Sequence, residues 1–232
     1  MFRFLMKIGG ALALAACSNQ AARLPREGDA RGELVDRVQA SPELAVLFTG
    51  NSYSFGVPRA FSKLAAARGK PVRVGHAVTS GWTLARHAAS EATLRKIRTG
   101  GWDIVVLQEH SEIPAMPARK RATAMDPALR QLVRKIRGAG AIPVLYQTWG
   151  RRDGDRHVRG DDFHAMSARL RVGYQAASRH AGGLLVIPVG DAWEREITAG
   201  RGGELYLEDG SHPSEVGNRV TAGEFYKAFF VK

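Results

Sequence analysis

Residues 44–54 read Leu-Ala-Val-Leu-Phe-Thr-Gly-Asn-Ser-Tyr-Ser, and this stretch gives the clearest indication of the fold class. Its first part, Leu44–Thr49, is a short and almost uninterrupted apolar run. A run of this length predicts a strand that is buried on both faces, as strands of parallel sheets are. Gly50 then permits a tight turn, and Ser52 follows where the chain is expected to enter a helix.

The alternation of strand-like and helix-like segments continues to the end of the chain. Further apolar runs predict strands at Val72–Val78, Asp103–Gln108, Ile142–Gln147 and Leu184–Val189. Helical spacing occupies roughly residues 57–68, 83–98, 118–138 and 162–181, and a last helix is expected near 214–230. Repeated strand–helix units imply right-handed crossovers. The sequence therefore predicts one α/β domain, a three-layer α/β/α sandwich with a five-stranded parallel sheet, flavodoxin-like in type.

Ser52 is a candidate nucleophile because ligands of such sheets bind beyond the carboxyl ends of the strands. Backbone N–H groups at a helix start, together with the positive end of the helix dipole, stabilise an oxyanion that forms on a substrate carbonyl. Serine is also a common helix N-cap, so the turn alone is compatible with a structural role. It is not the Gly-x-Ser-x-Gly elbow either, since Ser54 occupies the last position.

A second candidate segment lies near the end of the chain and reads Glu-Asp-Gly-Ser-His-Pro-Ser at residues 208–214. Asp209 precedes His212 by three residues, and a turn at Gly210 would let the carboxylate contact the imidazole. Such a carboxylate fixes the histidine tautomer and favours the imidazolium that forms when histidine accepts a serine proton. A surface turn before a helix is the alternative interpretation of this motif taken by itself.

Taken together, Ser52 after the first strand and Asp209-x-x-His212 before the last helix resemble the SGNH (GDSL-like) hydrolases. The resemblance spans about residues 44–230 and includes the order of strands and helices. It implies a serine hydrolase with a triad of Ser52, His212 and Asp209 and with no metal or organic cofactor. Gly50-Asn51-Ser52 stands where the family usually has Gly-Asp-Ser.

The resemblance also implies an oxyanion hole formed by the N–H of Ser52, the N–H of Gly81 and an amide side chain. The family carries Gly-x-Asn-Asp after its third strand, whereas this chain has Leu-Gln-Glu-His at residues 107–110. Gln108 has an amide one methylene longer than asparagine and is the expected third donor. The chain resembles a branch with Gly-Asn-Ser in the first block and Leu-Gln-Glu in the third.

Trp149 and Arg151 follow the fourth strand and are candidates for substrate contact. Tryptophan stacks on sugar rings and arginine binds carboxylates, although Trp149 would equally well cap the core. The loop after them is rich in Asp and His between residues 153 and 164. Its spacing fits no zinc or EF-hand pattern, so a solvated lid over the site is favoured over a metal centre.

The N-terminal region predicts a lipoprotein signal peptide at residues 1–16. Arg3 and Lys7 precede an apolar run that is too short to span a bilayer, and Cys17 follows Leu-Ala-Ala directly. Cys17 is the only cysteine of the chain, and its setting resembles a lipobox. We expect Cys17 to be lipidated, residues 17–42 to form the lipidated N-terminus and a tether, and residues 43–232 to form the hydrolase-like domain.

This predicted location and the net charge restrict the classes of molecule that the protein is expected to bind. Ser18 after the cysteine resembles the sorting pattern for the periplasmic face of the outer membrane. The chain has a net charge of +12, and removing residues 1–16 would take away two positive charges and no acid, leaving +10. A basic exported protein favours anionic surroundings such as lipid headgroups or acidic polysaccharides, and not nucleic acid.

The sequence thus predicts a lipid-anchored esterase of the cell envelope that hydrolyses O-acyl esters, with acyl groups on glycans or lipids as candidate substrates. Two alternatives remain open at this point. One is an acyltransferase on the same scaffold. The other is a non-catalytic glycan-binding lipoprotein, which the altered third block makes conceivable.

Overall fold

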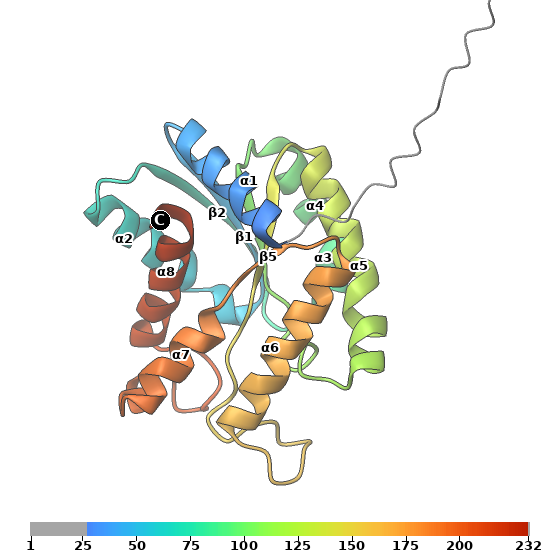
Figure 1. The fold of residues 1–232 in the computed structure, drawn as a ribbon, viewed down its shortest axis with the longest axis vertical. Helices are drawn as coiled ribbons and strands as arrows, with labels where there is room; N and C mark the ends of the chain where they lie inside the picture. The colour runs from blue at the N-terminus through green and yellow to red at the C-terminus, as the bar shows by residue number, and fades with distance from the viewer. Residues whose placement is uncertain (1–26, 232) are drawn as a thin grey trace, which may run out of the picture.

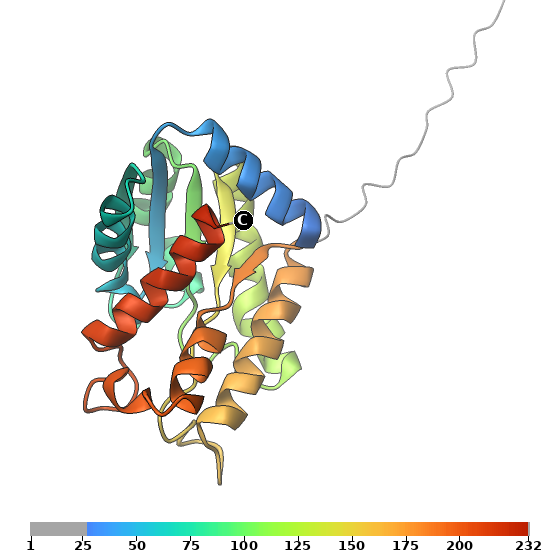
Figure 2. The same cartoon turned by 60° about the vertical axis from the view of Figure 1, so that its left-hand side comes forward.

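The computed structural model describes residues 27–231, which form a sheet covered by helices on both faces (Figures 1 and 2). The sheet has five parallel strands in the order β2-β1-β3-β4-β5. Their bounds are Leu44–Gly50 (β1), Val72–Val78 (β2), Ile104–Leu107 (β3), Ile142–Tyr146 (β4) and Leu185–Ile187 (β5). This strand order is that of the flavodoxin-like fold, as the sequence predicted.

Two groups of helices cover the two faces. One face carries α1 (Glu27–Ala40), α2 (Val57–Ala67), α7 (Val189–Thr198) and α8 (Glu215–Phe230). The other carries α3 (Leu84–Ala89), α4 (Glu91–Thr99), α5 (Ala118–Gly138) and α6 (Phe163–His180). Alternate residues of the central strands supply both cores: Val46 and Phe48 face the first group, and Leu47 faces the second. This explains why the strands read as continuous apolar runs.

The structure corrects the prediction for the segment before β1. Residues 27–40 form α1, and Ala30 and Leu34 are buried in the core under it. The tether prediction is therefore wrong for this part of residues 17–42. Of its 14 residues only Ala30 and Leu34 are buried hydrophobic residues, with Val38 partly buried, which explains why no strong apolar period was visible. The signal peptide, Cys17 and the rest of the predicted tether lie outside the described residues.

Two smaller differences concern helices. The helix expected at residues 83–98 is two helices, because Ser90 is extended and its side chain caps α4 by accepting from the Thr93 N–H. The short α7, which follows β5 directly, was not predicted. No helix within residues 27–231 is long and apolar enough to cross a membrane.

The sheet order places the candidate site between β1 and β3. These two strands are neighbours in the sheet. From β1 the chain passes to β2 on one side of the pair, whereas from β3 it passes to β4 on the other side. Thr49 is in register with Leu107, so the segments that follow the two strands leave the sheet side by side. Polar side chains on both segments therefore meet at this switch point.

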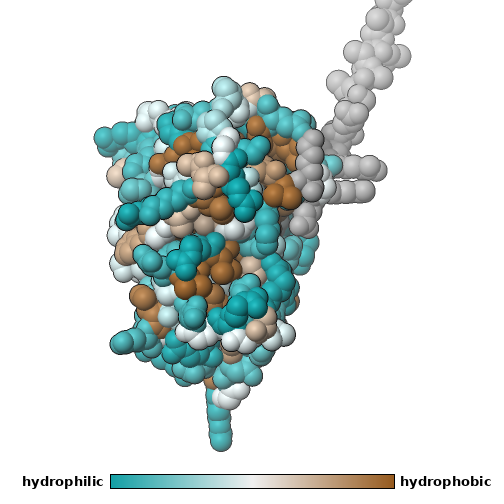
Figure 3. Space-filling view, turned by 90° about the vertical axis from the view of Figure 1, so that its left-hand side faces the viewer, coloured by the Kyte–Doolittle hydropathy of each residue, from teal (hydrophilic) through white to brown (hydrophobic). Residues whose placement is uncertain are grey.

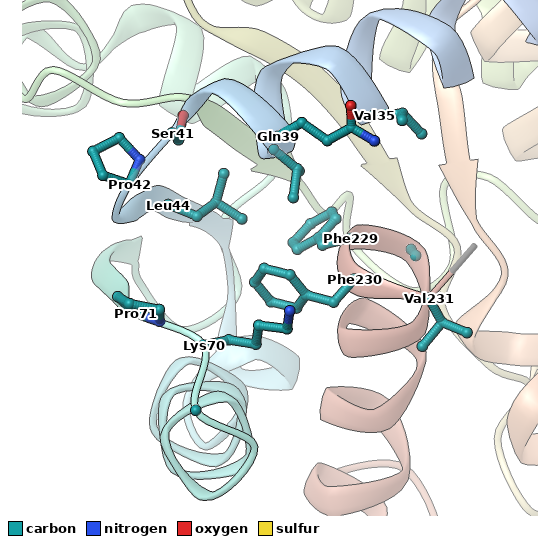
Figure 4. A pocket seen from close by; sticks show the side chains of 13 residues that line it. Val35, Gln39, Ser41, Pro42, Leu44, Lys70, Pro71, Phe229, Phe230 and Val231 are labelled. Atoms are coloured by element: carbon teal, nitrogen blue, oxygen red, sulfur yellow. The ribbon is translucent and has the colours of Figure 1, made fainter.

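A different hollow lies at the opposite end of the sheet, where β1 begins. Its volume is about 330 Å³, and it is bounded by the end of α1, the start of β1 and the last turn of α8. Phe229 and Phe230 of α8 lie across from Leu44 and Lys70 there (Figure 4), and Lys70 Nζ is 5.7 Å from the centroid of the Phe230 ring. The face seen in Figure 3 carries small hydrophobic patches that are separated by hydrophilic side chains.

Candidate active site

Ser52 begins a single 3-10 turn, η1 (Ser52–Ser54), between β1 and α2. Asn51 caps this turn, because its Oδ1 accepts a hydrogen bond from the Tyr53 N–H at 3.2 Å. Gly50 is required here by space, since a Cβ atom would lie 2.3 Å from Gln108 Oε1. The serine hydroxyl stays half-buried at the edge of a cleft, while the residues around it are buried.

Gln108 holds the turn of Ser52 in place through buried hydrogen bonds. Its Oε1 accepts from the Asn51 N–H at 2.8 Å and from the Ser54 hydroxyl at 3.0 Å. Its Nε2 donates to Asn51 Oδ1 at 3.0 Å and to the Glu109 carbonyl at 2.6 Å. The side chain is fully buried and does not line the cleft. The expectation that Gln108 donates to an oxyanion is therefore wrong, because both amide hydrogens already have partners.

His212 meets Ser52 across the cleft, although 160 residues separate them in the chain. The Ser52 Oγ and His212 Nε2 atoms are 2.9 Å apart, and His212 Nδ1 lies 2.5 Å from Asp209 Oδ2. Asp209 Oδ1 also accepts from the backbone N–H groups of Ser211 and His212, each at 2.9 Å. The three side chains thus have the relative arrangement of a hydrolytic triad.

These contacts determine the ionisation of Asp209. Partial burial raises the pKa of Asp209. Hydrogen bonds from the His212 side chain and from the His212 and Ser211 backbone lower it by more, so that the resulting pKa is about 2. The group is therefore a carboxylate at neutral pH. It orients the imidazole so that Nε2 points to the serine hydroxyl.

The segment that carries Asp209 and His212 is a small hairpin, residues 206–213. Tyr206 pairs with Pro213 in an isolated antiparallel bridge, and the Leu207 N–H donates to the His212 carbonyl at 2.9 Å. Gly210 has φ +64°, a left-handed conformation that favours glycine. The hairpin thereby holds the Asp209 carboxylate against the His212 imidazole.

Trp149 supports this hairpin from the protein interior. Its Nε1 donates to the Ser211 carbonyl at 3.1 Å, and its ring stacks between Tyr53 and Trp193, with centroid distances of 4.9 and 3.8 Å. Trp149 is 0% exposed and does not line the cleft. The expectation that it contacts substrate is therefore wrong, and its role at the strand end is to position the hairpin.

Two further residues that sequence reasoning missed also hold the hairpin. Arg152 donates its backbone N–H to the Gly210 carbonyl at 2.8 Å and a guanidinium N–H to the Leu207 carbonyl at 3.2 Å. The Tyr53 hydroxyl hydrogen-bonds with the Ser211 hydroxyl, and the Tyr53 ring packs edge-on against His212. Neither residue stood in a motif, so only their adjacency to Ser52 and Arg151 could have drawn attention to them.

The cleft beside Ser52 has a volume of about 180 Å³ and a polar wall. Gly81 lines it, as predicted, and its φ of +67° again requires the left-handed conformation. Arg151 also lines it, and its guanidinium contacts the Ser111 hydroxyl at 3.1 Å and Glu112 at 2.7 Å. The full lining is Asn51, Ser52, Tyr53, Ser80, Gly81, His110, Ser111, Arg151, Ser211 and His212.

His110 is the cleft residue for which the sequence suggested no task. It is half-buried, and burial lowers its pKa, while Glu112 raises it and Arg151 lowers it further. A neutral imidazole carries one N–H donor. His110 lines the cleft on the segment after β3, two residues beyond Gln108, and its imidazole is a candidate hydrogen-bond donor there.

The loop after β4 brings Asp155 and His157 toward Glu112. Their potential ligand atoms lie within 4.8 Å of one another, which is a spacing that could hold a cation. Arg151 already pairs with Glu112, and the Asp155 carboxylate accepts from the His157 N–H at 2.9 Å. The positive guanidinium beside the cluster opposes a second cation. A further acidic residue of the loop, Asp161, accepts two hydrogen bonds from the Arg169 guanidinium.

Searches for known relatives gave matches among solved structures only; no family model and no curated protein matched. A DUF4886 family protein from Bacteroides uniformis superposes with a TM-score of 0.72 at 19% identity, over 82% of this chain and 84% of its own. A candidate GDSL-like lipase from Parabacteroides merdae gives 0.61 at 14%, over 83% and 98%. A variant of an acetyl-xylooligosaccharide esterase from Geobacillus gives 0.61 at 16%, over 82% and 95%. The chain thus has the fold of GDSL-like hydrolases.

Proposed function

We propose that the protein is a serine esterase that hydrolyses carboxylic O-acyl esters, with Ser52 as nucleophile, His212 as general base and acid, and Asp209 as the group that orients His212. The observation that carries this proposal is the contact of 2.9 Å between Ser52 Oγ and His212 Nε2, together with the Asp209 carboxylate on the other ring nitrogen. This geometry argues against a binding protein that has lost the chemistry, because a binding role does not need it.

The reaction follows from these positions in two steps. Ser52 Oγ attacks the ester carbonyl carbon as its proton passes to His212 Nε2, and the same proton then leaves with the alcohol as the C–O bond breaks. Water next attacks the acyl group on Ser52 while giving a proton to Nε2. Ser52 Oγ leaves, regains that proton, and the carboxylic acid is released. Asp209 stays ionised throughout, since its pKa is about 2.

The negative charge on the substrate oxygen needs donors within the same cleft. The backbone N–H groups of Ser52 and Gly81 are the two donors that we carry over from the sequence prediction. We propose His110 in place of Gln108 as the third, since His110 lines the cleft, burial lowers its pKa and so favours the neutral imidazole, and the Gln108 amide is engaged elsewhere. Preorganised donors of this kind account for a large part of the rate enhancement in acyl transfer.

The shape of the cleft bears on the substrate. A volume of about 180 Å³ with a polar wall accommodates a short acyl group such as acetyl and a hydroxylated alcohol part better than a long lipid chain. We propose O-acylated glycans or lipids of the cell envelope as substrates, reached by a protein whose Cys17 is lipidated on the periplasmic face of the outer membrane. The predicted signal peptide, the basic charge and the esterase named among the structural neighbours support this.

The test compares the wild-type protein with Ser52→Ala in the hydrolysis of p-nitrophenyl acetate and in labelling by a fluorophosphonate probe. We expect the substitution to abolish labelling and to lower kcat by at least about 1000-fold. Ser41→Ala is the matched control, because Ser41 lies at the other end of β1. Equal rates for wild-type and Ser52→Ala would exclude Ser52 as the nucleophile.

A further inference from the structure

We propose that Glu109 is a positioning residue for the oxyanion side of the cleft, because one oxygen of its carboxyl group joins the segment that carries Gly81 to the segment that carries His110. This inference rests on the proposed esterase function. It concerns a residue that makes no hydrogen bond with the triad side chains and to which the resemblance to hydrolases assigns no role.

The carboxyl group binds both segments through the same atom. Glu109 Oε1 accepts from the Leu84 N–H at 3.0 Å and from the His110 N–H at 2.7 Å. Leu84 is 25 residues away in the chain and begins α3, directly after the loop that contains Gly81. One donor thus follows the loop of Gly81 by three residues, and the other is the N–H of His110; Gly81 and His110 both line the cleft.

Glu109 is the one hydrogen-bonding link between these two segments within residues 27–231. The loop of Gly81 has its own link to the serine turn, since Asn51 Nδ2 donates to the Trp82 carbonyl at 3.0 Å. The segment of His110 has its own link to the wall of the cleft through Ser111 and Arg151. Glu109 adds the third link, which joins these two segments to each other. The distance between the donors at Gly81 and His110 therefore depends on Glu109.

The surroundings of Glu109 are unfavourable for a carboxyl group, which indicates that it is kept for these two bonds. The side chain is 0% exposed, and Oε2 is buried without a hydrogen-bond partner among the described residues. Burial raises the pKa of Glu109 to about 7, although the N–H groups of His110 and Leu84 lower it. An apolar residue would avoid this cost if nothing but packing were needed.

The predicted effect is specific to the transition state. Substrate binding in the ground state does not need the donors at their final separation, whereas the tetrahedral intermediate does. A shift of about 1 Å in such a group costs up to about 100-fold in rate. Loosening the two segments should therefore lower kcat and leave KM almost unchanged.

Two substitutions separate the bond from the charge. Glu109→Gln keeps the length of the side chain and an acceptor oxygen for both N–H groups, and we expect its kcat to stay within about threefold of wild type. Glu109→Asp keeps the charge but is one methylene too short to accept from both, and we expect kcat to fall about 10- to 100-fold with KM within about twofold. Asp126→Asn is the control for loss of another buried carboxylate, because Asp126 pairs with Arg121 and His180 away from the cleft.

The measurement is kcat and KM for p-nitrophenyl acetate, with a thermal melt of each variant. Wild-type kcat for both Glu109 variants, or a kcat that follows melting temperature across all three variants, would overturn the positioning role. An impaired Glu109→Gln beside an active Glu109→Asp would overturn it as well, since charge would then matter more than reach. Ser52→Ala in the same assay reports on the esterase function itself: if it keeps wild-type activity, the function fails and the role of Glu109 fails with it.

Discussion

The two halves of the candidate triad are held in different ways. The serine turn is held by a buried hydrogen-bond network. In it, Asn51 and Gln108 are both buried and form two hydrogen bonds with each other, of 2.8 and 3.0 Å. The histidine lies on an exposed hairpin, where the side chain of Asp209 is 48% and that of His212 is 38% exposed. The nucleophile is therefore fixed by the core of the protein, and the base by a surface segment with a few supports beneath it.

This difference indicates which part of the site depends on overall folding and which does not. Removing a member of the buried network leaves orphaned polar atoms in the core and should cost stability. Removing a group of the hairpin should affect the reaction at a smaller cost to the fold, because the Asp209 and His212 side chains remain partly exposed to solvent. The substitutions below test that contrast, from the largest expected effect to the smallest.

The largest effect is expected for the base itself. His212→Ala should lower kcat by about 10⁴- to 10⁶-fold, because no other group accepts the serine proton, and it should leave the melting temperature almost unchanged. Hydrolysis of p-nitrophenyl acetate measures the first quantity and thermal unfolding the second. The exposed His76→Ala is the matched control. A large loss of stability in His212→Ala would contradict the view that the hairpin is energetically separate from the core.

In the buried half, Gln108→Ala should show the opposite combination of effects. It leaves the Asn51 N–H and the Ser54 hydroxyl without a partner and opens a cavity, so we expect the free energy of unfolding to fall by about 3 kcal/mol or more. Urea unfolding measures this. Gln131→Ala, which removes a single hydrogen bond to the Ala88 carbonyl, should cost about 1 kcal/mol. Equal losses for the two glutamines would mean that the network under Ser52 is not special.

Glu109 gives a prediction for the dependence of stability on pH. Burial raises its pKa in the folded protein from 4.5 to about 7, so the folded state binds the proton more tightly than the unfolded state. Stability contributed by this group is therefore present at low pH and is lost as the pH rises through 7. Glu109→Gln does not titrate, and its stability relative to wild type should increase by up to about 3 kcal/mol between pH 4.5 and pH 8. A constant difference across that range in urea unfolding would show that burial does not shift the pKa.

The smallest effect is expected for a support of the hairpin. Trp149→Phe keeps a stacked ring but removes the donor to the Ser211 carbonyl, so we expect kcat to fall about 3- to 10-fold and stability by about 1 kcal/mol. Trp102→Phe is the control, because the Trp102 Nε1–H also donates to a carbonyl, that of Lys96, but away from the cleft. The control should lose similar stability and no activity. Equal activity of both variants would mean that the Trp149 bond does not position His212.

Most of the fold was predictable, because buried parallel strands give apolar runs that differ plainly from helical spacing. Val72–Val78 and Ala118–Gly138 have the expected bounds, Asp209 contacts His212 as their spacing indicated, and Ser52 joins them as the family resemblance implied. Such features depend on the local chain or on the order of the elements. Both survive in a sequence that is only 14–19% identical to the matched structures.

Two of the errors concern the direction in which a side chain points, and a third concerns a missed helix. Gln108 has the right chemistry for an oxyanion donor, but its amide is consumed by Asn51 and Glu109, which only the three-dimensional contacts reveal. Trp149 stands at a strand end, where a side chain can face the cleft or the core with the same local sequence. The helix at residues 27–40 was missed because Ala30 and Leu34 are its only buried hydrophobic residues and Val38 is only partly buried, which is too little for a clear period.

The stack of Trp149 on Trp193 gives the molecule a built-in optical probe. The two indoles are parallel within 1°, with their centroids 3.8 Å apart, and Trp149 is bonded to the segment that carries His212. Indoles in such contact couple their electronic transitions, so the pair contributes to the circular dichroism of the protein. Displacement of the hairpin on ligand binding should change that contribution, so that motion at the site can be followed in the unlabelled protein.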